Sequence, residues 1–343
     1  MSLHELFPQA TVYTSIYQPE HMPEVIRRMH IQASFMQRLP GILSHHRWYF
    51  PLSPLAFQSF DLRDFDLVIT NTQGFANGVR VDGGPRTICY CLTPMRWAWN
   101  TEAYVEREGA RGPLRAAMQP AMAAMRTWDR WAAGHMQHFI GISRAVAERI
   151  KRAYGRQAAV IYPPVEAQRH NIAQDVGDYF LVVSRLAPYK RIDLAVQACA
   201  RLNLPLVVIG AGRDLPRLQA MAGPSVTFLG FVEDDEVVRA YLAGCRAFLF
   251  PGEEDFGITP LEAQSCGRPA IAYAAGGALD TIKPGETGEL FPEQTVDALA
   301  EVLARFDATR YDPQRIREHA LQFDSSIFKQ RMAEFVNGVL NGA

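Results

Sequence analysis

The sequence lacks the features that mark several classes of protein. It has 343 residues but only five cysteines, and no C-x-x-C pair among them, which argues against a zinc site or a disulfide framework. No apolar run approaches the roughly 18 residues of a membrane span, and no signal peptide is visible. No internal repeat or low-complexity tract is present either. We therefore expect the cysteines to be small core residues of a protein from a reducing compartment.

A net charge of either sign is also missing. The chain has 35 Lys+Arg against 36 Asp+Glu, a formal charge of −1, which excludes a general polyanion binder and argues against nucleic acid as a partner. The halves differ, however. Residues 1–164 hold 18 Lys+Arg against 12 Asp+Glu, and the remainder holds 17 against 24. The first half is expected to face an anionic membrane or a pyrophosphate-bearing substrate. The alternative is that its arginines simply lie on solvent-exposed faces of helices.

The length suggests two domains of ordinary size or one large one. A hydrophobic content of 48% and a charged content of 21% are typical of a soluble globular enzyme. Short apolar runs alternate with helical patterns in both halves, which predicts parallel sheets with helices on both faces. Residues 165–177 are polar and without periodicity, so we place a linker there, between domains at 1–164 and from 178 onward.

The first domain has an unusual opening. A nucleotide-binding α/β domain normally begins with a strand and a glycine-rich turn before its first helix. Here residues 1–7 resemble the end of an amphipathic helix, and residues 10–17 resemble a strand. The first domain is therefore expected to lack its first strand and its Gly-rich loop.

The most informative stretch is Pro251 to Pro269, which lies between two apolar runs, 245–250 and 269–273. Within it, 259–266 reads as a short helix that follows the end of a buried strand. Open α/β sheets bind ligands at such points, and helix N-termini attract anions. Glu254 and Glu262, eight residues apart, suit the neutral hydroxyls of a sugar and a ribose beside a phosphate. Alternatively, Glu254 is a solvated loop acid and Glu262 a first-turn partner of the helix dipole.

Cations follow the first strand of the second domain. Arg185 is expected at the carboxyl end of that strand, and Lys190 opens the next helix. Two cations on one rim suit a diphosphate, whose charge must be stabilised as it departs; ordinary surface charge is the alternative. Gly210 and Gly212 follow the next strand and would let a ligand approach the backbone, although the third glycine of a dinucleotide fingerprint is missing.

Several motifs of the second half are specific in combination. They are Ser184-Arg185-Leu186 with Lys190, Gly210-Ala211-Gly212, Phe228-Leu229-Gly230-Phe231-Val232, Glu254-x7-Glu262 and Gly276-Gly277. With them the chain resembles the family 4 retaining glycosyltransferases of GT-B fold. The segments 91–99 and 142–165 are similar to the mannosyltransferase branch of that family.

The resemblance implies a fold and a set of roles. It implies two Rossmann-like domains facing across a cleft, with the last helix, in residues 322–343, returning to the first domain, and a donor domain at 178–321. Arg185 and Lys190 would bind the donor diphosphate, Glu262 the ribose, and Glu254 the sugar near its reacting carbon. The other donor-binding residues implied are Phe256, Gly257 and Ile258, through backbone contacts to sugar and phosphate, and Thr259, Val232, Gly210 and Gly212.

On the acceptor side, the resemblance points to Thr93, Arg96 and Trp97. It also implies transfer with retention, without a cofactor and without a metal. The D-x-D pattern Asp64-Phe65-Asp66 precedes a predicted strand and is interpreted as solvated. Relatives usually have a histidine where this chain has Leu92, so that imidazole is missing or supplied from elsewhere.

The resulting hypothesis is transfer of mannose from GDP-mannose to a lipid-linked or oligosaccharide acceptor during surface polysaccharide assembly. A cytoplasmic location follows, with peripheral contact at the inner membrane face through the basic first domain. That contact is suggested by a cluster of four tryptophans, Trp97, Trp99, Trp128 and Trp131. The alternative is that these tryptophans belong to the core. The rival hypotheses are a sugar-nucleotide-binding protein without transfer activity and a UDP-sugar-dependent transferase or epimerase.

Overall fold

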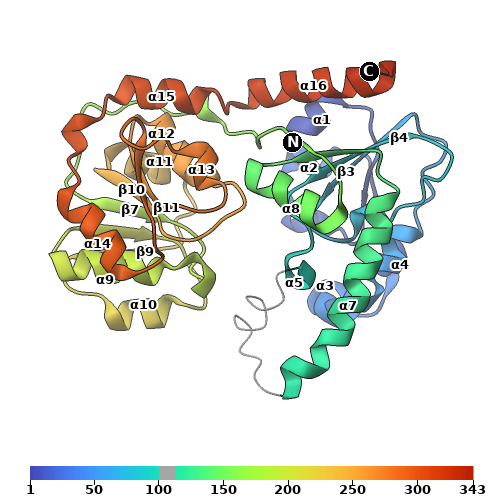
Figure 1. The fold of residues 1–343 in the computed structure, drawn as a ribbon, viewed down its shortest axis with the longest axis horizontal. Coiled ribbons are helices and arrows are strands. Elements are labelled where there is room, and N and C mark those ends of the chain that lie inside the picture. Colours follow the sequence, from blue (N-terminus) through green and yellow to red (C-terminus); the bar gives the residue numbers. More distant parts are fainter. Residues whose placement is uncertain (100–112, 343) are drawn as a thin grey trace. The chain divides into compact units, whose positions relative to one another are not determined.

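The computed structural model describes residues 1–99 and 113–342 (Figure 1). The chain forms two compact units, Met1–Ile161 with Lys329–Ala343, and Tyr162–Phe328. Residues 165–177, where we predicted a linker, belong to the second unit. The last helix, α16 (Ser325–Asn341), carries the chain from the second unit back into the first.

The first unit is built on a parallel sheet of four strands in the order β3-β4-β5-β6. These strands are β3 (Leu67–Thr72), β4 (Arg86–Cys91), β5 (His138–Gly141) and β6 (Ala159–Val160). Two further strands, β1 (Val12–Thr14) and β2 (Ile31–Ala33), pair in parallel as a separate sheet. The strand predicted at residues 10–17 therefore exists, but outside the main sheet.

Local sequence accounts for both ends of one helix of this unit. Helix α8 (Arg144–Tyr154) begins where the Ser143 hydroxyl accepts a hydrogen bond from the Val146 N–H, and it ends at Gly155 in the left-handed conformation. The other α-helices are α1 (Ser2–Leu6), α2 (Glu24–Arg27), α3 (Ile42–His45), α4 (Ser53–Gln58), α5 (Arg96–Trp99) and α7 (Pro113–Gly134). The 3-10 turns are η1 (Pro19–His21), η2 (Phe35–Arg38), η3 (His46–Leu52) and η4 (Phe75–Gly78).

The second unit has a six-stranded parallel sheet in the order β12-β11-β10-β7-β8-β9. Its strands are β7 (Phe180–Val183), β8 (Leu206–Ile209), β9 (Val226–Gly230), β10 (Ala247–Phe250), β11 (Ala270–Tyr273) and β12 (Gly288–Phe291). The chain winds outward from β7 in one direction and from β10 in the other. Because β7 and β10 are neighbours, the point where the winding reverses lies between their carboxyl ends, which is where doubly wound sheets bind ligands.

Helices cover both faces of this sheet. They are α9 (Ile192–Leu202), α10 (Leu215–Met221), α11 (Asp235–Gly244), α12 (Ile258–Ser265), α13 (Ala278–Thr281), α14 (Val296–Arg305) and α15 (Pro313–Leu321). In Figure 1, α9, α10 and α14 lie on one side of the strands, and α11, α12 and α13 on the other. The 3-10 turns are η5 (Ala167–Arg169), η6 (Pro188–Lys190) and η7 (Ala308–Arg310).

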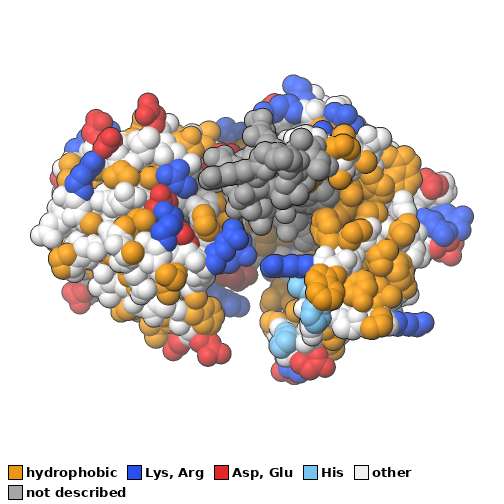
Figure 2. Space-filling model, turned by 90° about the horizontal axis from the view of Figure 1, so that it is seen from below, with side chains coloured by type: hydrophobic (Ala, Val, Ile, Leu, Met, Phe, Trp, Pro, Cys, Tyr) orange, Lys and Arg blue, Asp and Glu red, His pale blue; other side chains and the backbone are white. Residues whose placement is uncertain are grey.

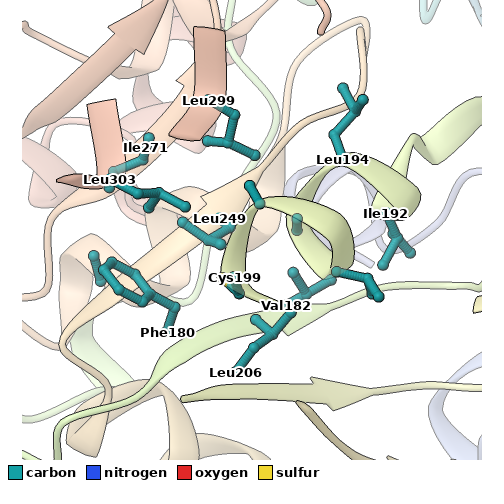
Figure 3. Close-up of a cluster of buried hydrophobic side chains, with 14 of the residues drawn as sticks. Phe180, Val182, Ile192, Leu194, Cys199, Leu206, Leu249, Ile271, Leu299 and Leu303 are labelled. Atoms are coloured by element: carbon teal, nitrogen blue, oxygen red, sulfur yellow. The ribbon is translucent and has the colours of Figure 1, made fainter. Parts of the chain in front are cut away.

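The core follows from strand alternation. Phe180 and Val182 of β7 belong to a cluster of buried side chains with α9 and α14, whereas Leu181 between them belongs to a second cluster with α11 and α12. Figure 3 shows the first cluster, in which side chains from the strands and from α9 meet. Successive side chains of a strand point to opposite faces, so a continuous apolar run fills two cores. The sheet thereby gives the loops at its carboxyl edge a fixed base.

Candidate active site

The structure brings Lys190 and Glu254 together where the winding of the sheet reverses. Lys190 lies in η6, after β7, and Glu254 lies in the loop after β10. The Lys190 Nζ and Glu254 Oε1 atoms are 2.7 Å apart, and the two side chains are 22% and 15% exposed. Both residues line a small pocket with Ser184, Pro251 and Gly252. Two of the predicted catalytic residues therefore occupy one site.

The ion pair is partly withdrawn from water, which strengthens the attraction between its charges. Oε1 of Glu254 is buried, and apart from the Lys190 ammonium no group of the described chain is placed to bind it. A phosphate would compete with Glu254 for Lys190, and a hydroxyl donor would compete with Lys190 for Glu254. A ligand that carries both groups could replace the pair in full.

Tyr189 holds the two predicted cations on one rim. Its hydroxyl oxygen accepts a hydrogen bond of 2.6 Å from Nη2 of Arg185. The Arg185 guanidinium and the Lys190 ammonium lie 5.7 Å and 5.4 Å from the centroid of the Tyr189 ring. Cations at such distances are attracted by the ring quadrupole. The sequence reasoning missed Tyr189, although its position between the two cations was visible.

The N-terminus of α12 supplies a group for anions at the same edge of the sheet. Gly257 precedes the helix in the left-handed conformation, with φ of 98°, and no side chain caps the helix. The N–H groups of the first turn, at Ile258 and Thr259, are of the kind that binds phosphate. Glu262 lies one turn further on. Burial, and next the charge of Asp235, raise the pKa of its carboxyl above the ordinary value.

The side chains of two other predicted donor residues, Phe256 and Val232, pack within the second unit. The Phe256 side chain is 3% exposed and stacks on Tyr162, with ring centroids 5.7 Å apart. Only its backbone is available to a ligand. Val232 packs partly against the second core cluster, whereas the neighbouring Phe231 is 76% exposed.

Four glycines support the two loops that carry the site. A Cβ on Gly210 would lie 1.9 Å from the Ser184 carbonyl oxygen, and one on Gly212 would lie 2.1 Å from that of Leu186. Similarly, a Cβ on Gly276 would lie 2.1 Å from the Glu254 carbonyl oxygen, and one on Gly277 would lie 2.2 Å from Phe256 Cα. Backbone therefore approaches each glycine, which gives them a structural role besides the ligand contact that we expected of Gly210 and Gly212.

We expect Gly277→Ala to loosen the Glu254 loop. The added methyl group would collide with the Phe256 backbone, which should lower the free energy of unfolding by about 1–3 kcal/mol. Gly338→Ala in α16 is the control, because no atom lies within 4 Å of its added Cβ; it should stabilise by about 0.5–1 kcal/mol. Urea unfolding measures both, and equal stability of the two variants would contradict this role of Gly277.

The predicted acceptor-side residues lie in the first unit. Thr93 is buried, and its hydroxyl has no hydrogen-bond partner in the described chain. Arg96 and Trp97 belong to α5, and the Trp97 side chain falls outside the described part of the structure. Helix α5 is fixed to α7, since Trp99 Nε1 donates a hydrogen bond of 2.7 Å to Oδ2 of Asp129. Burial raises the pKa of Asp129.

The predicted tryptophan cluster is only partly a surface feature. Trp99 is half-buried against Asp129, and Trp128 is half-buried, whereas Trp131 is 49% exposed. Asp64 and Asp66 are exposed just before β3, at the position expected for the D-x-D pattern. In residues 1–99 and 113–342, no three His, Cys, Asp or Glu side chains are grouped to hold a metal ion. No helix of the same residues has the length and apolarity to span a membrane.

Family models match almost the whole chain in two consecutive parts. Residues 3–169 match the model described as Glycosyltransferase Family 4, and residues 166–323 match Glycosyl transferases group 1. The chain belongs to glycosyltransferase family 4. The resemblance read from the sequence motifs is thereby confirmed.

Curated relatives of this glycosyltransferase include mannosyltransferases. A GDP-mannose-dependent alpha-mannosyltransferase of Mycobacterium tuberculosis is 32% identical over 226 residues, which is 65% of this chain and 52% of the relative. A GDP-mannose-dependent monoacylated alpha-(1-6)-phosphatidylinositol monomannoside mannosyltransferase of Corynebacterium glutamicum is 36% identical over 35% of each chain. Glycogen synthase of Xanthomonas oryzae is 34% identical over 39% of this chain and 28% of its own length. The matches thus span about half of these relatives or less.

Solved structures confirm the predicted GT-B fold of this glycosyltransferase. Sucrose-phosphate synthase from Thermosynechococcus elongatus superposes with a TM-score of 0.76 at 20% identity, over 99% of this chain and 92% of that one. Anabaena HepE in complex with UDP and glucose gives a TM-score of 0.70 at 18% identity, over 98% and 95%. At these identities the likeness concerns the fold.

Proposed function

We propose that this glycosyltransferase transfers mannose from GDP-mannose to a lipid-linked or oligosaccharide acceptor, with retention of the anomeric configuration. The observation that carries the proposal is the Lys190–Glu254 ion pair between the carboxyl ends of β7 and β10. A nucleotide sugar has both groups that would separate this pair, a diphosphate for the cation and sugar hydroxyls for the carboxylate.

In the proposed reaction, the bond between the sugar C1 and the diphosphate oxygen breaks. A bond forms between C1 and an acceptor oxygen, whose proton passes to the departing nucleoside diphosphate. Lys190, Arg185 and the α12 N-terminus stabilise the charge that develops on the diphosphate. Glu254 binds the sugar near C1 and Glu262 binds the ribose. Because two cations and a helix N-terminus serve the leaving group, we propose that the reaction needs no metal.

Mannose as the sugar and GDP as the carrier are supported by the names of the relatives from M. tuberculosis and C. glutamicum. The second name describes a lipid acceptor, which supports a lipid-linked acceptor for this enzyme. We accordingly propose a role in surface polysaccharide or glycolipid assembly, at the cytoplasmic side of a membrane. Peripheral contact would be made through the first unit, where cationic residues are in excess.

Binding of nucleoside diphosphates tests the donor part of the proposal. We expect GDP to raise the thermal unfolding midpoint more than UDP, ADP or TDP, with and without a metal chelator. A ligand at a hundred times its dissociation constant adds about 2.7 kcal/mol of stability. A UDP-selective shift would keep the transferase and replace the donor. A shift that needs a metal would contradict metal independence, and no shift with any nucleotide would contradict the site.

A further inference from the structure

The first unit exposes a set of large hydrophobic side chains on consecutive short elements. Phe35, Leu43, Trp48, Phe50 and Leu55 are 42%, 44%, 77%, 43% and 53% exposed. We call these five residues the docking surface. They come from η2, α3, η3 and α4, of which α3 contacts both η2 and η3, and η3 contacts α4. Figure 2 shows hydrophobic side chains gathered on a face of this unit, with histidines beside them.

The arrangement is more than a few scattered apolar residues. Three of the exposed residues are each next to a buried residue in the chain: Phe35 to Met36, Leu43 to Ile42, and Leu55 to Ala56. The three buried residues form a small core of their own. These elements therefore pack some apolar side chains against the unit and expose others to solvent. Contiguous apolar surface of this kind marks sites of interaction.

Aromatic contacts extend the docking surface onto α7. The Phe50 ring contacts Phe75 at a centroid distance of 5.2 Å, and Phe75 contacts Trp128 at 5.5 Å. The ring centroid of Trp128 lies 6.3 Å from that of Trp131, and the Trp131 side chain is 49% exposed. Trp48, the most exposed of these residues, was not among the tryptophans that we had considered.

The charge around the surface identifies the partner. Residues 25–60 contain no Asp or Glu, but they contain four arginines and three histidines. Arg38 and Arg47 are exposed and have no ion-pair partner in the described chain. Tryptophan and arginine around an apolar face are typical of proteins that lie in the interface of an anionic bilayer. A second copy of the same face would instead bring like charges together.

We propose that the docking surface inserts into the interfacial region of an anionic lipid bilayer. Leu43, Trp48, Phe50 and Leu55 would enter the boundary between headgroups and acyl chains, and Arg38 and Arg47 would contact lipid phosphates. The inference deepens the peripheral contact and the lipid-linked acceptor proposed above, and it rests on them. It assigns the contact to an apolar surface in residues 35–55 rather than to the overall basic charge of the unit.

Flotation with vesicles tests the proposal on the full chain. We expect the protein to float with phosphatidylcholine vesicles that contain about 30% phosphatidylglycerol, and to bind pure phosphatidylcholine vesicles at least about tenfold more weakly. Leu43→Ser with Trp48→Ser should lower binding to the anionic vesicles at least about tenfold. Val176→Ser with Val237→Ser, at exposed positions of the second unit, should bind like the wild type.

A second pair of variants separates charge from insertion. Arg38→Gln with Arg47→Gln should weaken binding to anionic vesicles about tenfold and make the remaining binding less dependent on salt concentration. Absence of flotation for the wild type, or undiminished flotation of Leu43→Ser with Trp48→Ser, would overturn the proposal. So would a wild-type dimer in solution that the same variant converts to a monomer, because the face would then bind a second copy.

Stabilisation by GDP, measured on every variant, distinguishes this proposal from the proposed function. We expect the same GDP shift in the docking-surface variant as in the wild type, since the surface belongs to the first unit. Loss of flotation with a retained GDP shift supports both proposals. Flotation of the wild type without a shift for any nucleotide would leave the docking surface standing and contradict the donor site.

Discussion

Glu254→Gln is expected to lower kcat by about 10²–10³-fold, the loss found when one electrostatic contact to the reacting group is removed. The amide keeps the shape of the side chain but loses the charge that faces Lys190 across 2.7 Å. GDP affinity should be unchanged or slightly higher, because Lys190 no longer has a carboxylate competing with the diphosphate. Steady-state transfer kinetics and GDP titration measure the two effects.

The control for this variant is Glu301→Gln, which removes one negative charge from a side chain of α14 that is 75% exposed. It should transfer at the wild-type rate. Near-normal transfer by Glu254→Gln would remove Glu254 from its proposed role. Loss of GDP binding along with transfer would show instead that Glu254 supports the fold of the loop.

The double variant Arg185→Ala, Lys190→Ala should lose donor binding itself. Hydrogen bonds to charged groups contribute about 1.5–3 kcal/mol each, so the dissociation constant for GDP should rise at least about 100-fold. Binding of guanosine, which has no diphosphate, should change far less. Calorimetric titration with the two ligands measures the difference.

Arg305→Ala with Arg310→Ala is the matched control, since it removes two exposed cations from the same unit. Its GDP affinity should equal that of the wild type. If both double variants weakened GDP binding equally, the effect would come from the net charge of the unit. The local rim formed by Arg185, Tyr189 and Lys190 would then have no special part in binding.

Much of the second unit could be predicted because its strands are continuous apolar runs. Residues 245–250 were expected as a buried strand and contain β10, and β7 is the strand expected at the start of the second domain. Both strands supply side chains to the two cores, so nearly all of their residues are apolar and the strands can be recognised in the sequence. The helix expected at 259–266 begins one residue earlier, at Ile258. Its proline falls in the first turn, where the missing N–H costs little.

Other elements have a weaker hydrophobic pattern in the sequence and were not predicted. Strand β12 (Gly288–Phe291) was not predicted, because it begins with a glycine, contains the charged Glu289 and lies at the edge of the sheet. Helix α15 (Pro313–Leu321) was also missed, although Asp312 accepts a hydrogen bond from the Gln314 N–H and Pro313 opens the helix. Its polar and charged residues together outnumber its apolar ones, which obscured the helical pattern.

Within the site, the sequence indicated residue types but not their contacts. The spacing of Glu254 and Glu262 suggested two hydroxyl-binding carboxylates, yet the ion pair of Glu254 with Lys190 joins loops 64 positions apart and depends on β7 and β10 being neighbours. Gly210 and Gly212 were interpreted as places for a ligand. They are also approached by the backbone of neighbouring loops, and such long-range contacts have no signature in a single sequence.

The most direct test of the account is transfer of radiolabelled mannose from GDP-mannose to lipids extracted from membranes, in the presence of a metal chelator. We predict a labelled lipid product whose new linkage has the α configuration of the donor, as retention requires. Its rate of formation should fall at least about 100-fold with Glu254→Gln and stay at the wild-type level with Glu301→Gln. A β-linked product, or transfer that the chelator abolishes, would contradict the proposed mechanism, and no labelled product would contradict mannosyl transfer to lipid.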